Sequence, residues 1–262
     1  SFKGEKVMSK GRFTIPTDES FVEGTKIIAE KWGADAVRDC DGTKLPENPG
    51  QFGKVYNTYF VVRGDNEWAR KHPEEAQRIF LLSNRNLATN ETLEIDIMKG
   101  FLKDEFDPDY AYIDLWEVYD RTTGIKHEKW GYNSINGIVT IENAILFHEY
   151  TVTFLARVTW HPVQIYNYLT NEWTCEKQLT YDPAFPATKK YIVEHMKKWC
   201  EENPETSVVR FTTFLYQFTL IFNNLGKEKQ VEWFGYAQTA NPVLMEEFEK
   251  ESGIRLFAED FV

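Results

Sequence analysis

The sequence of 262 residues lacks most of the features that place a protein in a class at first sight. No apolar run approaches the ~20 residues that a bilayer-spanning helix needs, and the chain does not open on a signal-peptide pattern. Its three cysteines, Cys40, Cys175 and Cys200, are an odd number without the spacing of metal ligands. We therefore expect a protein of the reducing cytoplasm that does not associate with a membrane.

The motifs of several common chemistries are also missing. The chain has no Gly-x-Gly-x-x-Gly pattern and no Gly-Lys-Ser/Thr phosphate loop, so we expect no nucleotide cofactor. It has no Gly-x-Ser-x-Gly elbow, and no cysteine has an obvious base beside it. The histidines are scattered along the chain, so we expect no metal site. They are His72, His127, His148, His161 and His195.

Positive charge is in deficit as well. Lys and Arg number 30 against 41 Asp and Glu, and the net charge of −11 argues against nucleic acid or an anionic membrane surface as a partner. What the chain does have is a hydrophobic content of 42%, enough for one large α/β domain or two small ones. Aromatic residues reach 15%, with 8 tryptophans. Aromatic faces are typical of sugar-binding sites, although most such rings belong to the core.

The N-terminal region predicts a parallel strand–helix–strand unit. Residues 11–16 and 34–38 have strand character, and Gly33 is placed to end the helix between them. The helix itself is predicted from residues spaced for one buried face. These residues are Phe21, Thr25, Ile28, Ala29 and Trp32.

The stretch 207–222 is rich in β-branched and aromatic residues and is apolar on both faces, which is typical of a strand buried in a parallel sheet. Arg210 lies inside it. Because a guanidinium group cannot lose its charge, Arg210 needs either a structural ion pair or the polar groups of a ligand in a cavity. The sequence leaves these two interpretations open at about even odds.

Between residues 56 and 147 the helix–strand alternation gives way to strands separated by turns. We interpret this region as an antiparallel β-rich insertion, with its charges on a solvated face, inside an α/β barrel domain that covers residues 1–262. Parallel strands are then expected near residues 13, 37, 152 and 210. Four strands are half of an eight-stranded barrel. The predicted fold class is therefore α/β, the N-terminal portion of a (β/α)8 TIM-type barrel, with an open α/β sheet as the alternative.

Two predicted strand ends carry arginines, Arg38 and Arg210, and the C-terminal ends of parallel strands are where α/β folds place ligand sites. Farther along, Val163 and Asn167 share one face of a predicted helix that could line a pocket rim. Spacing alone favours, by about two to one, a helix face that packs in the core with the Asn167 amide hydrogen-bonded, rather than a face that lines a pocket. These residues suit a polar or anionic small substrate and leave the chemistry open.

Several of these segments together resemble the galacto-N-biose/lacto-N-biose phosphorylases. The similarity runs from about Gly11 to Val262 and is carried by residues 11–16 (Gly-Arg-Phe-Thr-Ile-Pro), 32–38 (Trp-Gly-Ala-Asp-Ala-Val-Arg), 148–152, 208–214, 217–220 and 233–235. Family members are (β/α)-barrel enzymes followed by further domains. The resemblance therefore implies the N-terminal part of such a barrel.

The resemblance also implies an activity: inverting phosphorolysis of β-galactosides to α-galactose 1-phosphate and a free acceptor sugar, with inorganic phosphate as co-substrate and no cofactor. Arg38, Asn167 and Arg210 match positions that hold the galactoside. Val163 matches a position bordering the acceptor subsite, and Trp233 an aromatic wall of the pocket. Because phosphate is itself a nucleophile, one general acid suffices where an inverting hydrolase needs two carboxylates.

The sequence departs from the family pattern in two ways. His161 stands where family members commonly carry an aspartate, which leaves the acceptor open among N-acetylglucosamine, N-acetylgalactosamine and rhamnose. The family's general-acid aspartate and part of its phosphate-binding set lie beyond the segment that ends at Val262. We therefore expect a piece of a larger protein that supplies galactoside-binding residues but no catalytic acid, and that is inactive alone.

The expected partners are a β-galactosyl disaccharide, phosphate and the rest of the protein's own chain, with a homodimer left open. The competing hypotheses are a non-catalytic galactoside-binding module and a β-galactosyl-rhamnose phosphorylase. More remote is a sugar hydrolase, which would need two facing carboxylates near Arg210.

Overall fold

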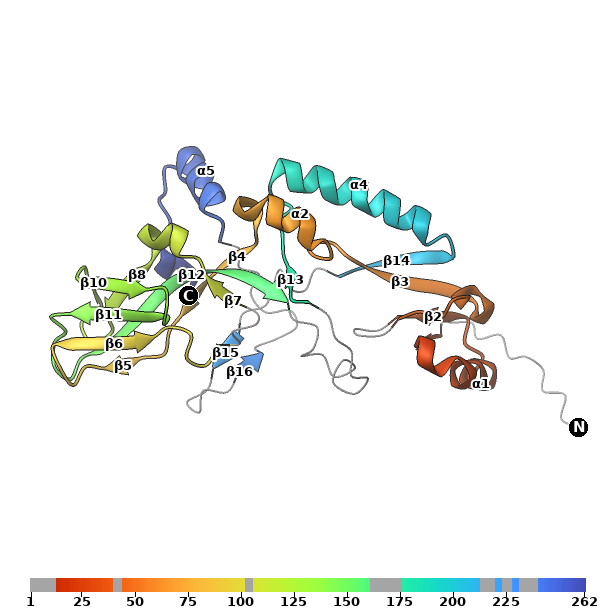
Figure 1. The fold of residues 1–262 in the computed structure, drawn as a ribbon, viewed down its shortest axis with the longest axis horizontal. Helices are drawn as coiled ribbons and strands as arrows, with labels where there is room; N and C mark the ends of the chain where they lie inside the picture. Colours follow the sequence, from red (N-terminus) through yellow and green to blue (C-terminus); the bar gives the residue numbers. More distant parts are fainter. Residues whose placement is uncertain are drawn as a thin grey trace, which may run out of the picture. The chain divides into compact units, whose positions relative to one another are not determined.

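The computed structural model describes residues 13–39, 44–101, 106–160, 176–212, 220–222, 228–230 and 240–262. They divide into two compact units, whose helices and strands are labelled in Figure 1. The parallel unit comprises the described parts of Ser1–Gly64, His161–Gln178 and Asp182–Thr213. The antiparallel unit comprises those of Asp65–Trp160, Leu179–Tyr181 and Phe214–Val262. None of the helices that the structure describes is long and apolar enough to cross a membrane.

The parallel unit is built on a four-stranded sheet whose neighbouring strands are all parallel. Its strands, in spatial order, are β1 (Thr14–Pro16), β2 (Ala36–Arg38), β3 (Lys54–Phe60) and β14 (Thr206–Thr212). Its helices are α1 (Val22–Trp32) and α4 (Pro186–Glu202), with short 3-10 segments η1 (Glu19–Phe21) and η2 (Pro49–Phe52). The described strands do not close into a barrel.

Local sequence explains where α1 begins and ends. The carboxylate of Asp18 accepts a hydrogen bond from the Ser20 backbone N–H and caps η1, which leads into the helix. Gly33 ends α1 in the left-handed conformation at φ 65°. The helix buries only Thr25 and Ala29, small side chains that allow close approach to the sheet. The predicted burial of Phe21 and Trp32 is wrong, because both lie at the ends of the helix and remain more than half exposed.

Alternation along β3 gives the parallel sheet two different faces. Val55 packs in the core cluster with α1, and the Tyr59 hydroxyl donates a hydrogen bond to the carbonyl of Ile192 in α4. Because side chains alternate along a strand, Tyr56 and Thr58 point to the opposite side. One face of the sheet is therefore covered by helices, and the other carries polar side chains.

The antiparallel unit is organised around one long strand, β12 (Glu149–Trp160). Along one edge β12 pairs with β5 (Asn86–Leu87) and β4 (Arg78–Leu82), and along the other with β8 (Glu117–Asp120) and β7 (Phe106–Pro108). Four further elements of the unit are β9 (Ile125–Lys126), α2 (Asn66–Lys71), η3 (Pro73–Glu75) and η4 (Tyr110–Leu115). Figure 1 shows β12 as the long green arrow of this unit.

The remaining strands form smaller sheets or extend the large one. A three-stranded antiparallel sheet has the order β10 (Trp130–Asn133), β11 (Ile138–Glu142), β6 (Thr92–Asp96). The short strand β13 (Gln178–Leu179) belongs to the β12 sheet, and β15 (Leu220–Phe222) pairs with β16 (Glu228–Gln230). The described chain ends with α5 (Pro242–Ser252), capped by Asn241, and η7 (Ala258–Phe261).

Two strand predictions are wrong in direction. The strand near residue 152, predicted parallel, is the antiparallel β12, and the strand from Val55, predicted in the insertion, is the parallel β3. An apolar run marks a strand buried on both faces, and this burial occurs at the centre of either kind of sheet. The sequence of residues 120–124, Asp-Arg-Thr-Thr-Gly, predicts a hairpin turn. This prediction is confirmed, since the Gly124 N–H donates to the Asp120 carbonyl at 2.7 Å between β8 and β9. Whether residues 56–147 interrupt a barrel stays a prediction.

Burial also departs from expectation at charged and edge positions. The prediction that charges of residues 56–147 face solvent is wrong for Arg78, Asp109 and Asp120, which are buried. The strand around Arg210 is not buried on both sides as predicted, because β14 is the last strand in the described sheet order and Phe211 is 57% exposed.

Candidate functional site

Arg38 and Arg210 lie on the same face of the parallel sheet. Arg38, the last residue of β2, is in register with Tyr56, and Arg210 of β14 is in register with Thr58. Since Tyr56 and Thr58 are two residues apart on β3, their side chains and those of their partners share one face. This face is the one opposite α1 and α4.

Both guanidinium groups keep unused hydrogen-bond donors. Arg38 makes one hydrogen bond, from Nη1 to the carbonyl oxygen of Asp39 at 3.1 Å. Arg210 makes one, from Nε to Oγ1 of Thr58 at 3.1 Å. In the part of the chain that the structure describes, neither forms an ion pair with a carboxylate. A guanidinium group has five N–H donors, so the described residues leave most of the donors of these two half-buried arginines unused.

Thr58 and Asp39 hold this region together. The Thr58 backbone N–H and hydroxyl both donate to the Asp39 carboxylate, at 3.1 and 2.7 Å. The Asp39 N–H donates to the carbonyl of Tyr56, which continues the β2–β3 ladder one residue past Arg38. Thr58 was not predicted as a site residue from the sequence. The available signal was a threonine inside a strand next to the predicted site strand, which is too common to be diagnostic.

The other residues predicted for the site lie outside the described part of the chain. They are Val163, Asn167 and Trp233, together with His161, where the sequence departs from the family pattern. The loop that follows Arg38 is described only at Asp39 and again from Lys44. The predicted roles of these residues therefore stay predictions.

The parallel unit holds an acidic cavity of about 500 Å³. Its lining includes four carboxylates, those of Asp39, Glu47, Glu202 and Glu205, against the single cation of Lys44. Neither Arg38 nor Arg210 lines it. Its charge disfavours a phosphate or another anion, so we do not place the substrate there.

Tyr59 points to the helix-covered side of the parallel sheet. Burial, with a smaller contribution from Cys200, raises the pKa of Tyr59 to about 12. Its hydroxyl lies 2.9 Å from Nδ1 of His195, and its ring packs edge-on against Trp199. The hydroxyl therefore stays protonated near neutral pH and acts as a structural donor rather than as a base.

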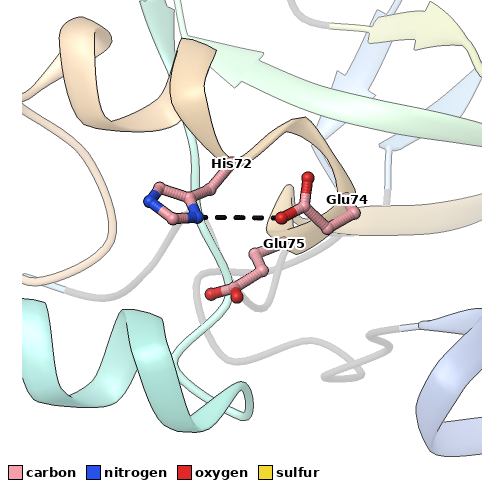
Figure 2. Close-up of side chains that lie close together, drawn as sticks. All are labelled: His72, Glu74 and Glu75. Carbon is pink, nitrogen blue, oxygen red and sulfur yellow. Dashed lines mark ion pairs between the residues drawn. The ribbon is translucent and has the colours of Figure 1, made fainter.

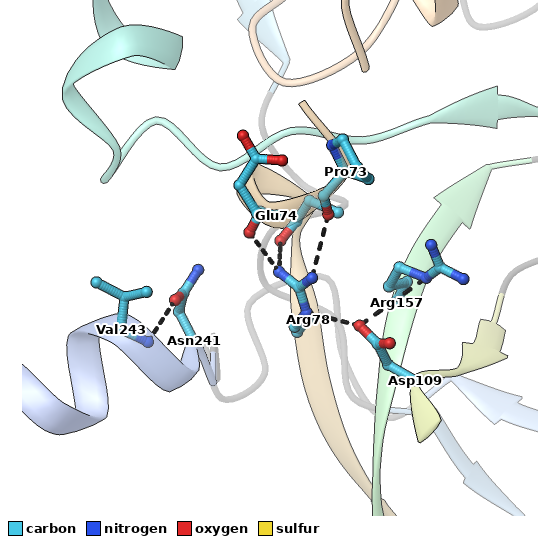
Figure 3. A network of polar contacts seen from close by, with 8 residues as sticks. Pro73, Glu74, Arg78, Asp109, Arg157, Asn241 and Val243 are labelled. Atoms are coloured by element: carbon cyan, nitrogen blue, oxygen red, sulfur yellow. Dashed lines mark hydrogen bonds and ion pairs between the residues drawn. The ribbon is translucent and has the colours of Figure 1, made fainter. Parts of the chain in front are cut away.

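A buried arginine in the antiparallel unit provides a contrast with the sheet arginines. Arg78 is 3% exposed, and its Nε donates to the Asp109 carboxylate at 2.8 Å. Its terminal nitrogens donate to the backbone carbonyls of Pro73, Glu74 and Ala76 at 2.8 to 3.1 Å, as Figure 3 shows for the first two. These bonds use every nitrogen of the guanidinium group, so Arg78 fixes the turn around η3 and offers little to a ligand.

The same turn brings together three side chains with metal-ligand chemistry. His72, Glu74 and Glu75 each place a ligand atom within 4.8 Å of the others, and His72 Nδ1 lies 3.7 Å from Glu74 Oε1 (Figure 2). The His72 ring stacks on Trp68 at 4.0 Å between centroids. This group was not predicted from the sequence, because a single histidine beside two glutamates is ordinary on a charged surface. Such a group could hold a divalent cation, but Glu74 is exposed and all three side chains come from one short turn.

Asp120 and His148 form a close acid–base pair in the antiparallel unit. His148 Nδ1 lies 2.7 Å from Asp120 Oδ2, and the N–H groups of Thr122 and Thr123 donate to Oδ1. Burial alone would raise the pKa of Asp120, but these hydrogen bonds outweigh it and hold the pKa below its ordinary value of 3.8. The carboxylate is thus ionised and structural, and it secures the turn between β8 and β9.

Comparison with known proteins gives a consistent result across nearly the whole chain. Residues 11–262 match the family model described as the lacto-N-biose phosphorylase N-terminal TIM barrel domain. A 1,3-beta-galactosyl-N-acetylhexosamine phosphorylase of Lachnoclostridium phytofermentans is 47% identical over 94% of this chain and 35% of its own length. A phosphorylase of the same name from Bifidobacterium longum is 44% identical over 97% of the chain and 35% of its own length.

A third relative differs in its named substrate. A D-galactosyl-beta-1->4-L-rhamnose phosphorylase of L. phytofermentans is 36% identical over 98% of this chain and 37% of its own length. The chain thus spans about a third of the length of the curated relatives that it matches.

Proposed function

The chain belongs to the lacto-N-biose phosphorylase family, and from this premise we propose that it supplies the galactoside-binding half of an inverting β-galactoside phosphorylase. The reaction transfers the galactosyl group from a β-galactosyl disaccharide to inorganic phosphate. The products are α-galactose 1-phosphate and the free acceptor sugar. Inversion follows from a single displacement at the anomeric carbon.

One observation carries this proposal: two arginines share the face of the parallel sheet opposite α1 and α4, and their donors are mostly unused by the described chain. A structural arginine would have its donors occupied, as Arg78 does. Guanidinium groups with free, planar donors are suited to sugar hydroxyls and to oxyanions. We assign the galactosyl group to Arg38 and Arg210.

The remaining roles follow from the family pattern. Asn167 would complete the contacts to the galactosyl group, Val163 would border the acceptor subsite, and Trp233 would form an aromatic wall. Phosphate attacks the anomeric carbon from the face opposite the leaving oxygen, while a general acid protonates that oxygen. We assign no residue of this chain as the general acid, and the reaction needs no metal or organic cofactor.

The identity of the acceptor sugar is proposed from the named relatives. Three relatives named for N-acetylhexosamine are 42–47% identical to the chain, against 36% for the relative named for rhamnose. We therefore propose N-acetylglucosamine or N-acetylgalactosamine as the acceptor, joined through a β-1,3 bond. Rhamnose is the alternative.

The test is a phosphorolysis assay on the full-length protein that contains this chain. The protein is incubated with galactosyl-β-1,3-N-acetylglucosamine, galactosyl-β-1,3-N-acetylgalactosamine or galactosyl-β-1,4-rhamnose, each with and without phosphate. Phosphate-dependent formation of α-galactose 1-phosphate, followed by ³¹P NMR, is expected with the first two substrates. Release of free galactose without phosphate would indicate a hydrolase, and binding of the disaccharides without turnover would favour a binding module.

A further inference from the structure

Resting on the proposed function, we propose that Thr58 and Asp39 are positioning residues, which hold the guanidinium groups of Arg210 and Arg38 in the orientation that meets the galactosyl group. Neither residue was predicted for the site from the sequence. Neither needs to touch the substrate. They act through the two arginines.

The direction of the hydrogen bonds is fixed by the groups involved. The Arg210 guanidinium can only donate, and an ionised Asp39 carboxylate can only accept. The Thr58 hydroxyl between them must therefore accept from Arg210 Nε, at 3.1 Å, and give its single proton to Asp39 Oδ1, at 2.7 Å. The Thr58 N–H donates to the other carboxylate oxygen at 3.1 Å, so the carboxylate cannot rotate without breaking a bond.

Because Thr58 binds Arg210 at Nε, the two terminal guanidinium nitrogens of Arg210 are not bonded within the described chain. The two terminal nitrogens form the fork that can meet two oxygens at once, and neither is used by the described chain. An unrestrained arginine side chain loses rotamer entropy when it is immobilised. A side chain already held in place avoids much of that loss when the ligand binds.

Asp39 connects the second arginine to the same support. Its backbone carbonyl accepts from Arg38 Nη1 at 3.1 Å, while its carboxylate reaches Arg210 through Thr58. Its own N–H is bonded to the Tyr56 carbonyl on β3, at 3.3 Å. Asp39, which is fixed to β3, thus supports both guanidinium groups on the face of the sheet opposite α1 and α4.

A purely structural role would use the same bonds to secure the end of β2, and kinetics separate the two roles. In the full-length enzyme, Thr58→Val removes the hydroxyl with little change of shape, and Thr58→Ser keeps it. Thr25→Val is the matched control, because Thr25 is also buried in the parallel unit and bonds Thr17 through its hydroxyl at 2.9 Å, while neither guanidinium group bonds to it within the described chain.

Losing a hydrogen bond to a charged group is expected to lower kcat/KM for the disaccharide by about 10- to 100-fold in Thr58→Val, and by less than about threefold in Thr58→Ser. In the reverse reaction the KM for α-galactose 1-phosphate rises by a similar factor. The KM for the acceptor sugar stays within about twofold, because the arginines hold the galactosyl side only. Thr25→Val lowers the unfolding temperature as much as Thr58→Val but leaves the kinetics unchanged.

Asp39→Asn gives a second measurement that does not depend on the fold tolerating valine. It retains the backbone carbonyl that Arg38 uses and weakens the acceptor for Thr58, so a fall in kcat/KM of about tenfold is expected. Wild-type kinetics in Thr58→Val, or equal losses in Thr58→Val and Thr25→Val, would overturn the inference while the phosphorylase activity stands. Absence of phosphate-dependent cleavage in the wild-type enzyme would overturn the proposed function itself.

Discussion

The antiparallel and parallel units both place arginines among buried residues, but they use them differently. In the antiparallel unit Arg78 is almost fully buried, and its donors are consumed by Asp109 and three backbone carbonyls. In the parallel unit Arg210 is half-buried and spends one donor on Thr58. The comparison teaches that burial alone does not identify a functional arginine. We propose that the number of guanidinium N–H donors left unbonded by the described residues is the better criterion.

If the comparison is right, removing Arg78 should be the most destabilising change. Arg78→Met would leave Asp109 buried beside only the distant Arg157 Nε at 3.9 Å, at an expected cost of about 3–5 kcal/mol. Hydrogen exchange of the β4 and β12 amides in the full-length protein would measure the local loss of stability. The double variant Arg78→Met/Asp109→Leu is the control. It should recover much of the stability, because replacing both members of a buried pair is far less costly than removing one.

Removing Arg210 should have the opposite effect, a large loss of activity with little loss of stability. Arg210→Ala is expected to reduce kcat/KM for the disaccharide by about 100-fold or more, equivalent to roughly 2.7 kcal/mol, while the unfolding temperature changes little. Arg210→Lys should restore only part of the activity, because a lysine cannot reproduce the planar fork. A large loss of stability with normal kinetics would place Arg210 in the same structural class as Arg78.

Two turn glycines, one in each unit, differ in how closely other atoms approach them. Gly53, just before β3, has φ +126°, and a Cβ there would lie 2.6 Å from the Asp35 carbonyl oxygen. Gly124, in the β8–β9 turn, has φ +74° with open space around it. Gly53→Ala should cost about 2–3 kcal/mol through strain and collision, and Gly124→Ala about 1 kcal/mol through strain alone. Thermal unfolding of both variants checks the ranking, and equal effects would refute the packing argument for β2 and β3.

The smallest expected effect concerns Asp120 and depends on pH. Its pKa is lower in the folded protein than the ordinary 3.8, so its stabilising effect is present above that value and is lost as pH falls toward the folded pKa. Asp120→Asn should therefore cost about 1 kcal/mol near pH 7 and progressively less below pH ~4. Unfolding temperatures of wild type and variant across this range provide the measurement. A gap that widens on acidification would contradict the assignment.

Sequence alone predicted the elements that depend on local chemistry. Gly33 ends α1 and the Asp120–Gly124 turn forms a hairpin, because caps and turns depend on a few neighbouring residues. The directions of β3 and β12 could not be predicted in this way, because the partner strands are distant in sequence and an apolar strand suits either kind of sheet.

The candidate site shows the same division. Arg38 and Arg210 were selected from the sequence because the C-terminal ends of parallel strands hold ligand sites, and their roles stay predictions. Thr58 escaped notice because its importance comes from pairing with Arg210, 152 residues away. The buried Arg78–Asp109 pair was misjudged for a similar reason, since charge suggests solvent until the partner is known.

We propose that the guanidinium N–H donors of Arg38 and Arg210 that the described residues leave unused bind the galactosyl group. A binding titration tests this most directly. Isothermal titration of α-galactose 1-phosphate into the full-length protein should show saturable binding that weakens about 100-fold or more in Arg210→Ala. Gly124→Ala, in the antiparallel unit, should bind like the wild type. Equal affinity of wild type and Arg210→Ala would contradict the claim and return Arg210 to a structural role.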